Sequence, residues 1–537
     1  MKRLLALMLS AVMLISLFAG CSKPEEETTT AAPTTAASSE PQNELDKTTV
    51  ATSAGQKMRT DVIIADGFDI VGFDPPDCND GYSGTMFTMI YDRLMEFDAA
   101  GEVQPMLVES YEMPSKTEYI FKLHEGVKFH NGDEMTAEDV VFSLNRANAN
   151  PKSQANFQNV IAIEQIDKYS FRIETSVPFA PMLLNLAHTQ TSILNKKVVE
   201  AAEANGGKYD EEDICGTGPM MHEEYRPNNF YKVVRFDDYW RGASRMTSLV
   251  RKIIPEASSQ TIALEAGEID YIASLNSIDI DRVKANPDLK TVEMVSNNIA
   301  YMGFNTTKAP FDNAKVRRAL QYASNKEAIV EVLYEGYGIP CTSIFPTVGV
   351  GFNDELGGYS FDLEKAKALL AEAGYADGIE FEVTVSSDIR SRAAQILQQD
   401  YGQIGVTINI NLMEFGAMLD YLSRKDHEAW IMSWGGATNP NNTLTNNFHT
   451  DAGGPTGNRM WYSNPEVDIM IEEAREEFDV EKRNAIYKEI QAVIMEDSPW
   501  IPLLQQTYVA GMHKGLDGVI MHEHGSRYYH DMVVYED

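Results

Sequence analysis

The sequence predicts an α/β protein with mixed sheets flanked by helices and at least two domains. The chain has 537 residues, which is too long for a single hydrophobic core. Strand-like and helix-like patterns alternate from residue 61 onwards, and this order is typical of layered α/β domains. No repeat of fixed period is present, so a repetitive surface adhesin is not expected.

The first residues resemble a bacterial lipoprotein signal peptide, residues 1–20. A positive pair follows the first methionine, an apolar run covers residues 4–18, and two small residues precede Cys21. The apolar run is shorter than the roughly 20 residues that a membrane span needs. We therefore expect Cys21 to become the lipidated first residue. Ordinary secretion, with Cys21 incidental, is the alternative.

Residues 21–58 are predicted to be a disordered tether. They consist mainly of Thr, Ala, Ser, Pro and Glu, and such a segment cannot bury enough apolar surface to fold. Later in the chain no stretch is long and apolar enough to span a bilayer. The tether would hold the folded part away from the membrane.

The charge balance excludes two classes of partner. The formal net charge is −35 at pH 7, whereas nucleic-acid binding requires a basic face. Broad adhesion to anionic lipid also requires basic segments. A large net charge instead favours solubility.

The hydrophobic patterns predict elements along the whole folded part. The expected strands lie at 61–65, 118–123, 165–175 (a strand pair), 229–236, 301–305, 379–385, 406–412 and 430–434. The expected helices lie at 84–94, 182–187, 196–205, 258–266, 361–374, 392–404, 464–470 and 480–495. A polar loop is expected at 435–446.

Residues 123–146 combine a strand end, a tight turn and a capped helix. Asn131 and Gly132 supply the positive φ angles of the turn. Thr136 is a good N-cap, and Asp139 stands three residues later in the reciprocal capping position. Apolar residues then recur at helical spacing up to Ala147.

This string closely resembles the signature of the extracellular solute-binding proteins of peptide-type ABC importers. That family includes oligopeptide-, dipeptide-, glutathione- and nickel-binding proteins. The resemblance extends from residue 61 to residue 537. Its further motifs are Ile-Tyr-Asp-Arg-Leu at 90–94, Gly-Thr-Gly-Pro at 216–219, Tyr-Trp-Arg-Gly at 239–242, Gly-Glu-Ile-Asp at 267–270, the segment 310–320 and Asp-Ser-Pro-Trp at 497–500.

The resemblance implies a type II periplasmic-binding-protein-like clamp with an extra subdomain. Ligand is held between two lobes, and closure about two crossing strands excludes water. The closed form would deliver its ligand to the transmembrane subunits of a permease, and the protein would be a monomer, lipid-anchored at the extracellular face of the bacterial cytoplasmic membrane. The implied divisions are lobe I at 59–97, 215–296 and 500–537, the extra subdomain at 98–214 and lobe II at 297–499.

The resemblance also implies ligand-binding residues. Trp434 and Gly435 begin the loop that forms the floor of the pocket in relatives. Peptide binders of the family place an Asp in this loop, but residues 435–442 contain no acid here, and Asn439 lacks the charge that holds an ammonium group strongly. This favours a neutral polar ligand, or an N-terminus held elsewhere.

Two arginines, Arg390 and Arg392, lie just before and at the start of the helix expected at 392–404. Some dipeptide binders place an arginine here for the ligand carboxylate, which suits Arg390 or Arg392; solvated surface charges are the alternative. The remaining candidates for the cleft wall are Phe73, Asp74, Thr217, Asn297, Asn298 and Tyr301.

We therefore predict a receptor for oligopeptides or dipeptides and not an enzyme. No nucleophile elbow and no His-Glu-x-x-His motif is present. No cofactor or metal is expected, because the pairs His124 and His130, and His522 and His524, have no spacing that commits to a metal. The alternative is the same fold binding an oligosaccharide or a nickel chelate. Of the remaining cysteines, Cys78, Cys215 and Cys341, at most one pair can form a disulfide, and burial as thiols is favoured.

Overall fold

The computed structural model describes residues 57–78, 80–98, 102–435, 439–454, 457–521 and 527–536. Cys21, the predicted signal peptide, all but the last two residues of the predicted tether, and the pair His522 and His524 lie outside the described residues. Within the described ranges, no helix combines the length and the hydrophobicity that crossing a bilayer requires.

One sheet connects the two lobes of the folded part. Its strand order is β16-β15-β17-β13-β18-β12-β2-β11-β10-β9, with β14 beside β18. The bounds are β2 Asp61–Asp66, β9 Met220–Arg226, β10 Phe230–Arg235, β11 Ser248–Ile253, β12 Tyr271–Ile272, β13 Leu289–Phe304, β14 Gly338–Pro340, β15 Ile379–Val385, β16 Val406–Leu412, β17 Ala429–Gly435 and β18 Trp500–His513.

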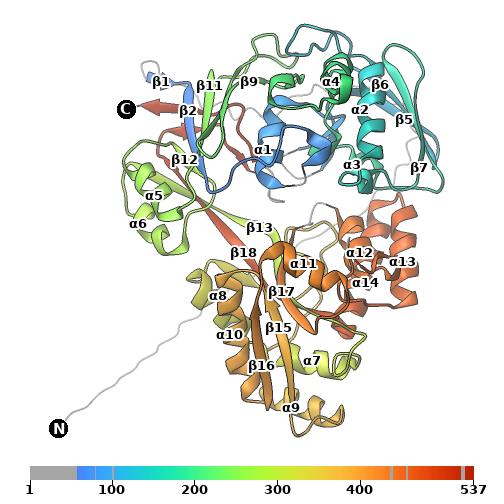
Figure 1. Ribbon diagram of the computed structural model, residues 1–537, viewed down its shortest axis with the longest axis vertical. Helices are drawn as coiled ribbons and strands as arrows, with labels where there is room; N and C mark the ends of the chain where they lie inside the picture. The colour runs from blue at the N-terminus through green and yellow to red at the C-terminus, as the bar shows by residue number, and fades with distance from the viewer. Residues whose placement is uncertain are drawn as a thin grey trace, which may run out of the picture. The chain divides into compact units, whose positions relative to one another are not determined.

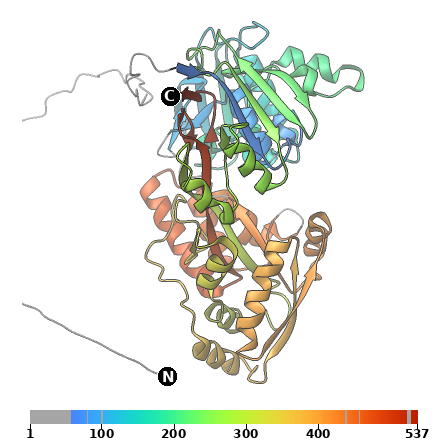
Figure 2. The same ribbon diagram turned by 90° about the vertical axis from the view of Figure 1, so that its left-hand side faces the viewer.

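Strands β13 and β18 belong to both lobes, as Figures 1 and 2 show. They pair antiparallel from Leu289 opposite His513 to Gly303 opposite Trp500. β12 joins β18 at one end of this ribbon and β17 joins β13 at the other. The sequence pattern predicted only the last part of β13, because its first half alternates weakly and depends on the distant strand β18 for its pairing.

Lobe II is a parallel arrangement of β15, β16 and β17 covered by helices (Figure 1). Side chains alternate across the sheet, so Ile431 enters one apolar cluster and Trp430 enters another. The helices are α7 Ala314–Tyr322, α8 Lys326–Tyr334, α9 Leu363–Glu372, α10 Asp388–Gly402, α11 Phe415–Ser423, α12 Pro440–Phe448, α13 Pro465–Glu476 and α14 Val480–Asp497.

Lobe I has its own clusters around β2, which pairs in parallel with β11 and β12. Its helices are α1 Gly81–Ile90, α5 Ala257–Glu265 and α6 Ile280–Lys284. A separate four-stranded sheet, of order β5-β6-β8-β7, has a further cluster and forms the extra subdomain. Its elements are β5 Val108–Ser115, β6 Glu118–Leu123, α2 Ala137–Ala149, β7 Val160–Gln165, β8 Ser170–Thr175, α3 Met182–Asn185 and α4 Lys196–Glu203.

The remaining short strands are distributed in three small sheets. β1 and β22 pair antiparallel, so the two ends of the described chain lie side by side. These strands are β1 Lys57–Arg59, β3 Met95–Phe97, β4 Val103–Pro105, β19 Leu516–Asp517, β20 Ile520–Met521, β21 Arg527–Tyr528 and β22 Val533–Glu536.

The predicted start of α2 is confirmed. The Asp139 carboxylate accepts hydrogen bonds from the Thr136 backbone N–H at 3.0 Å and from the Thr136 hydroxyl at 3.1 Å. Gly132 has a φ angle of 88°, as predicted, whereas Asn131 does not have the positive φ angle predicted for it. Local capping chemistry therefore determines this helix start.

Several helix boundaries differ from the sequence prediction, among them the starts of α1, α10 and α12. α1 begins three residues earlier than expected, behind the N-cap Asp80, and ends at Ile90. α10 begins at Asp388, so Arg390 and Arg392 lie inside the helix and not before it. The predicted loop at 435–446 contains most of α12, whose start is set by the N-cap Asn439 and a proline at the first helical position.

The Gly-Thr-Gly-Pro segment is required for close packing. A Cβ atom at Gly216 would lie 1.9 Å from the Ile90 carbonyl oxygen, and one at Gly218 would lie 2.6 Å from the Ile90 carbonyl carbon. Neither glycine has a positive φ angle. The two glycines are therefore required by the close approach of two backbone segments and not by a left-handed backbone conformation.

The three described cysteines, Cys78, Cys215 and Cys341, are buried free thiols. The favoured prediction of buried thiols is therefore confirmed for them.

Candidate functional site

Three helices begin at one edge of the lobe II sheet. β15 pairs in parallel with both β16 and β17, so the carboxyl ends of these strands lie at the same edge. α10, α11 and α12 each follow one of the strands within a few residues. Ligands of open α/β sheets bind outside the carboxyl ends of the strands, and helix N-termini carry partial positive charge. This edge is therefore suited to polar or anionic groups.

Arg390 lies in the first turn of α10 at this edge. Its guanidinium donates to the Ser387 hydroxyl at 3.3 Å and to the Ser433 hydroxyl of β17 at 3.4 Å. The side chain is half-buried, and none of the carboxylates in the described ranges forms an ion pair with it. A guanidinium with only neutral acceptors can form a bidentate pair with a ligand carboxylate.

Asn297, Asn298 and Gly435 lie together where β13 passes between the lobes. β13 shifts register against β18 between Val295 and Ile299, which makes an irregularity at the asparagines. A Cβ atom at Gly435 would lie 3.8 Å from atoms of both asparagine side chains. The Asn298 side-chain oxygen is buried without a hydrogen-bond partner, so it can accept an N–H donor. Irregular strand positions next to binding sites commonly redirect side chains in this way.

Trp434 and Asn439 are both tied to α12. The Trp434 indole N–H donates to the Thr443 hydroxyl at 3.2 Å. The Asn439 side-chain oxygen accepts from the Asn442 backbone N–H at 3.1 Å and caps the helix. Its amide nitrogen donates to the side-chain oxygen of Asn185 in the extra subdomain, at 2.6 Å. Asn439 therefore joins the two lobes.

Three predicted residues lie away from this group. Tyr301 is in the lobe II core, with its ring centroid 4.0 Å from that of Trp500. Thr217 is completely buried in lobe I, and its hydroxyl donates to Asp92 at 3.1 Å. Arg392 is exposed on α10 and donates to the Val332 carbonyl at 3.4 Å. The structure thus gives Tyr301 and Thr217 packing roles, because neither is accessible to a ligand.

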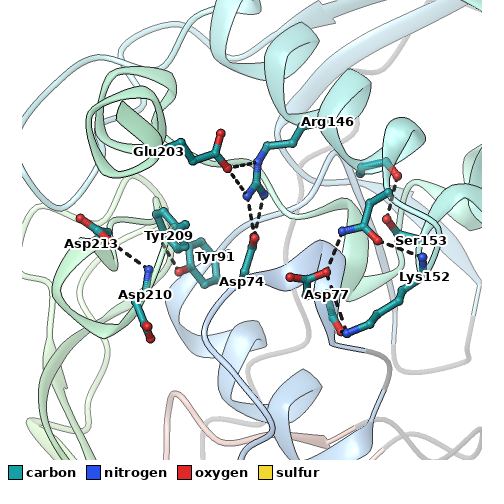
Figure 3. Close-up of polar contacts among 12 residues, drawn as sticks. Asp74, Asp77, Tyr91, Arg146, Lys152, Ser153, Glu203, Tyr209, Asp210 and Asp213 are labelled. Carbon is teal, nitrogen blue, oxygen red and sulfur yellow. Dashed lines mark hydrogen bonds and ion pairs between the residues drawn. The ribbon is translucent and has the colours of Figure 1, made fainter. Parts of the chain in front are cut away.

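Phe73 and Asp74 line a pocket between lobe I and the extra subdomain instead of the space between the two lobes. The cavity has a volume of about 540 Å³ and is formed by residues 71–78, the end of α2 and residues 203–210. Figure 3 shows Asp74 facing Arg146, which also contacts Glu203. Because Asp74 is committed to Arg146, it is not free to bind a ligand between the lobes.

Sequence reasoning missed several residues at the edge. Ser387 and Ser433 are near Arg390, and the Phe415 side chain is 47% exposed at the start of α11. The signal that could have found them is their shared position directly after, or at the end of, a parallel strand. Asn185 gave no such signal, since it ends a helix of four residues.

The histidines do not form a metal site in the part of the chain that the structure describes. The His130 ring is hydrogen-bonded to the backbone of the Gly-Thr-Gly-Pro segment, and the His124 ring packs 5.0 Å from Trp240. These two rings therefore have partners within lobe I.

Two lobes joined by crossing strands define the class of type II periplasmic binding proteins. The chain belongs to the bacterial extracellular solute-binding proteins of family 5: residues 102–456 match the family described as "Bacterial extracellular solute-binding proteins, family 5 Middle". Members of this family are solute-binding components of ABC importers and are not enzymes.

Similar proteins cover nearly the whole chain. Heme-binding protein A of Haemophilus influenzae is 31% identical over 514 residues, which cover 89% of this chain and 93% of that protein. The dipeptide-binding protein of Escherichia coli is 30% identical over 477 residues, covering 83% and 89%. The solved structure of DppA from Helicobacter pylori in complex with the peptide STSA has a TM-score of 0.77 at 27% identity, covering 88% and 99%.

Proposed function

We propose that this protein captures dipeptides or oligopeptides between its lobes and delivers them to the transmembrane subunits of an ABC importer. In this proposal it acts as a monomer, held at the extracellular face of the membrane by a lipid on Cys21. Lobe I comprises 59–97, 215–296 and 500–537, with the extra subdomain at 98–214, and lobe II comprises 297–499. Relatives named for a dipeptide and a solved complex with a tetrapeptide support the ligand class.

The observation that carries the proposal is the guanidinium of Arg390. It lies at the edge where α10, α11 and α12 begin, and its partners are the two hydroxyls of Ser387 and Ser433. A peptide carboxylate would replace these long contacts with charge-assisted hydrogen bonds.

The test compares Arg390→Gln with Arg392→Gln by isothermal titration calorimetry. The two arginines are two residues apart on one helix, and Arg392 is exposed, so it is a matched control. With Ala-Ala as the probe, we expect Arg390→Gln to weaken binding about 10- to 100-fold, since hydrogen bonds to charged groups contribute about 1.5–3 kcal/mol. Arg392→Gln should bind like the wild type. Equal effects of the two variants would contradict the role of Arg390.

A second measurement identifies the natural ligand. Native mass spectrometry of the purified protein, followed by denaturation, should release a mixture of short peptides. A sugar series, a nickel chelate or a single other mass would move the protein to the alternative, a non-peptide solute. That alternative is favoured by the absence of any acid at 435–442, and one relative is named for heme.

The proposed lipid anchor on Cys21 is tested separately. Membrane fractionation and intact-mass measurement of the wild type should show a lipidated, membrane-bound protein, and Cys21→Ser should release the unmodified chain. A wild-type protein that remains soluble and unmodified would exclude the anchor and leave the binding proposal unaffected.

A further inference from the structure

Two hydrogen bonds connect the extra subdomain to lobe II. Neither of them involves the crossing strands β13 and β18. The Asn439 amide nitrogen donates to the Asn185 side-chain oxygen at 2.6 Å. The Ala180 backbone N–H donates to the Arg475 carbonyl at 2.9 Å. Asn439 is the N-cap of α12 and Arg475 lies in the last turn of α13, so the contact with the extra subdomain involves two helices of lobe II.

The donor and acceptor roles of the asparagine pair follow from their other partners. Asn185 is 1% exposed, and its amide nitrogen donates to the Asn156 carbonyl at 2.9 Å. Its oxygen therefore faces Asn439 as an acceptor. The Asn439 oxygen already accepts from the Asn442 N–H, which leaves its amide nitrogen as the donor across the lobes.

Side chains next to the second hydrogen bond make further contacts at the same interface. The Arg475 guanidinium lies 3.3 Å from the Thr445 hydroxyl and 3.4 Å from the Asn441 oxygen, which ties α13 to α12. Phe478 follows α13 and packs against the cluster of the extra subdomain. The Lys116 ammonium lies 5.8 Å from the centre of the Phe478 ring. The interface between the extra subdomain and lobe II thus combines backbone, amide and apolar contacts.

We propose that Asn439 is a positioning residue: with Asn185, Ala180 and Arg475 it forms a clasp that stabilises the closed lobes and at the same time fixes the start of α12. One side chain caps the helix with its oxygen and holds the opposite lobe with its nitrogen. Closure and the position of the α12 N-terminus are therefore coupled. A clasp that contributes to closure without ligand reduces the free energy that ligand binding must supply. This inference goes beyond the proposed function, because it does not depend on which solute binds.

The test is hydrogen–deuterium exchange of the full chain in detergent, without ligand, resolved at the amide of Ala180. This amide reports closure directly, since its acceptor is the Arg475 carbonyl. Asn439→Asp and Asn439→Ser both retain an N-cap oxygen but remove the amide donor. Asn313→Ser is the matched control: Asn313 caps α7, also nine residues long, through the Lys315 N–H.

We expect both Asn439 variants to accelerate exchange of the Ala180 amide at least fivefold, while Asn313→Ser leaves it unchanged. Exchange within α12 should stay close to the wild type in Asn439→Asp, because the cap is retained. If Asn439→Asp exchanges like the wild type, the amide donor is not the clasp and the inference is wrong. An equal acceleration in Asn313→Ser would also overturn it. Because co-purified ligand is removed by unfolding and refolding before the measurement, failure of the peptide proposal cannot produce either result.

Discussion

Asp74 and Arg146 face each other through two parallel hydrogen bonds, of 2.7 and 2.6 Å (Figure 3). Asp74 follows β2 in lobe I, and Arg146 lies in α2 of the extra subdomain. Arg146 also contacts Glu203 at the end of α4, at 2.6 Å. The pair therefore joins the extra subdomain to lobe I, and we expect the two to move as one body when the lobes open.

Removing the Asp74–Arg146 ion pair should lower the free energy of unfolding of lobe I. Arg146→Gln leaves the carboxylate of Asp74, which is 8% exposed, without its cation. Breaking such a buried pair costs about 3 kcal/mol, which urea denaturation would measure. Arg172→Gln is the control, because Arg172 also contacts several carboxylates but lies on the surface of β8, where a loss of less than about 1 kcal/mol is expected. Similar losses for the two variants would contradict the role of the Asp74–Arg146 pair.

The close approach at Gly216 should not tolerate a side chain. Gly216→Ala would place a Cβ atom 1.9 Å from the Ile90 carbonyl oxygen, so the two backbones must separate. We expect a loss of about 2–3 kcal/mol, or failure to fold, as for other overpacked sites. Gly81→Ala is the control, since no atom lies within 4 Å of its Cβ position. A thermal melt of Gly216→Ala that matches the wild type would show that the segment can move apart.

Buried His130 should make the protein sensitive to acid. Burial removes water from the ring and lowers the pKa of His130 from 6.5 to about 4, although the hydrogen bond between the ring and the Gly218 carbonyl acts to raise it. The unfolded state therefore binds a proton between pH 6.5 and 4 that the folded state does not. This contribution to stability, about 3 kcal/mol, is present above pH 6.5 and is lost as the pH falls through 4. In His130→Gln, denaturation curves at pH 7 and pH 5 should differ less than in the wild type.

Buried Asp92 should have the opposite dependence. Burial raises the pKa of Asp92 from 3.8 to about 6, although the Trp240 N–H and the Thr217 hydroxyl donate to its carboxylate. The folded state therefore retains a proton between pH 4 and 6 that the unfolded state has released. The stabilisation of the folded state by this proton is complete below pH 4 and is lost as the pH rises through 6. Asp92→Asn should make the free energy of unfolding fall more steeply on acidification between pH 6 and 4; an unchanged slope would show that Asp92 is ionised throughout.

Local signals predicted much of the fold. The strands at 118–123, 379–385 and 406–412 have their expected bounds, because their apolar residues alternate and turns flank them. The start of α2 followed from the capping pair Thr136 and Asp139. In contrast, α12 starts with a proline followed by two asparagines and a threonine, so its helical state depends on the cap of Asn439 and on packing.

The candidate site was predicted less completely, for a physical reason. Gly435 and Asn298 meet because β17 pairs with β13, and Arg390 meets Ser433 because α10 begins at the same edge. These contacts are produced by sheet pairing between segments far apart in sequence, which no local pattern contains. The same holds for the contact between Asn185 and Asn439, which joins two lobes.

The position of β18 has a consequence for the order in which the chain can fold as it emerges from its N-terminus onwards. β18 starts at Trp500 and lies between β13 and β12 in the connecting sheet. Until this strand has emerged, β13 lacks one neighbour along most of its length, and β12 lacks its antiparallel partner. Neither lobe can therefore complete its part of the connecting sheet before β18 is available. During that interval an unpaired sheet edge is exposed, and we expect chaperones or a delayed collapse to protect it.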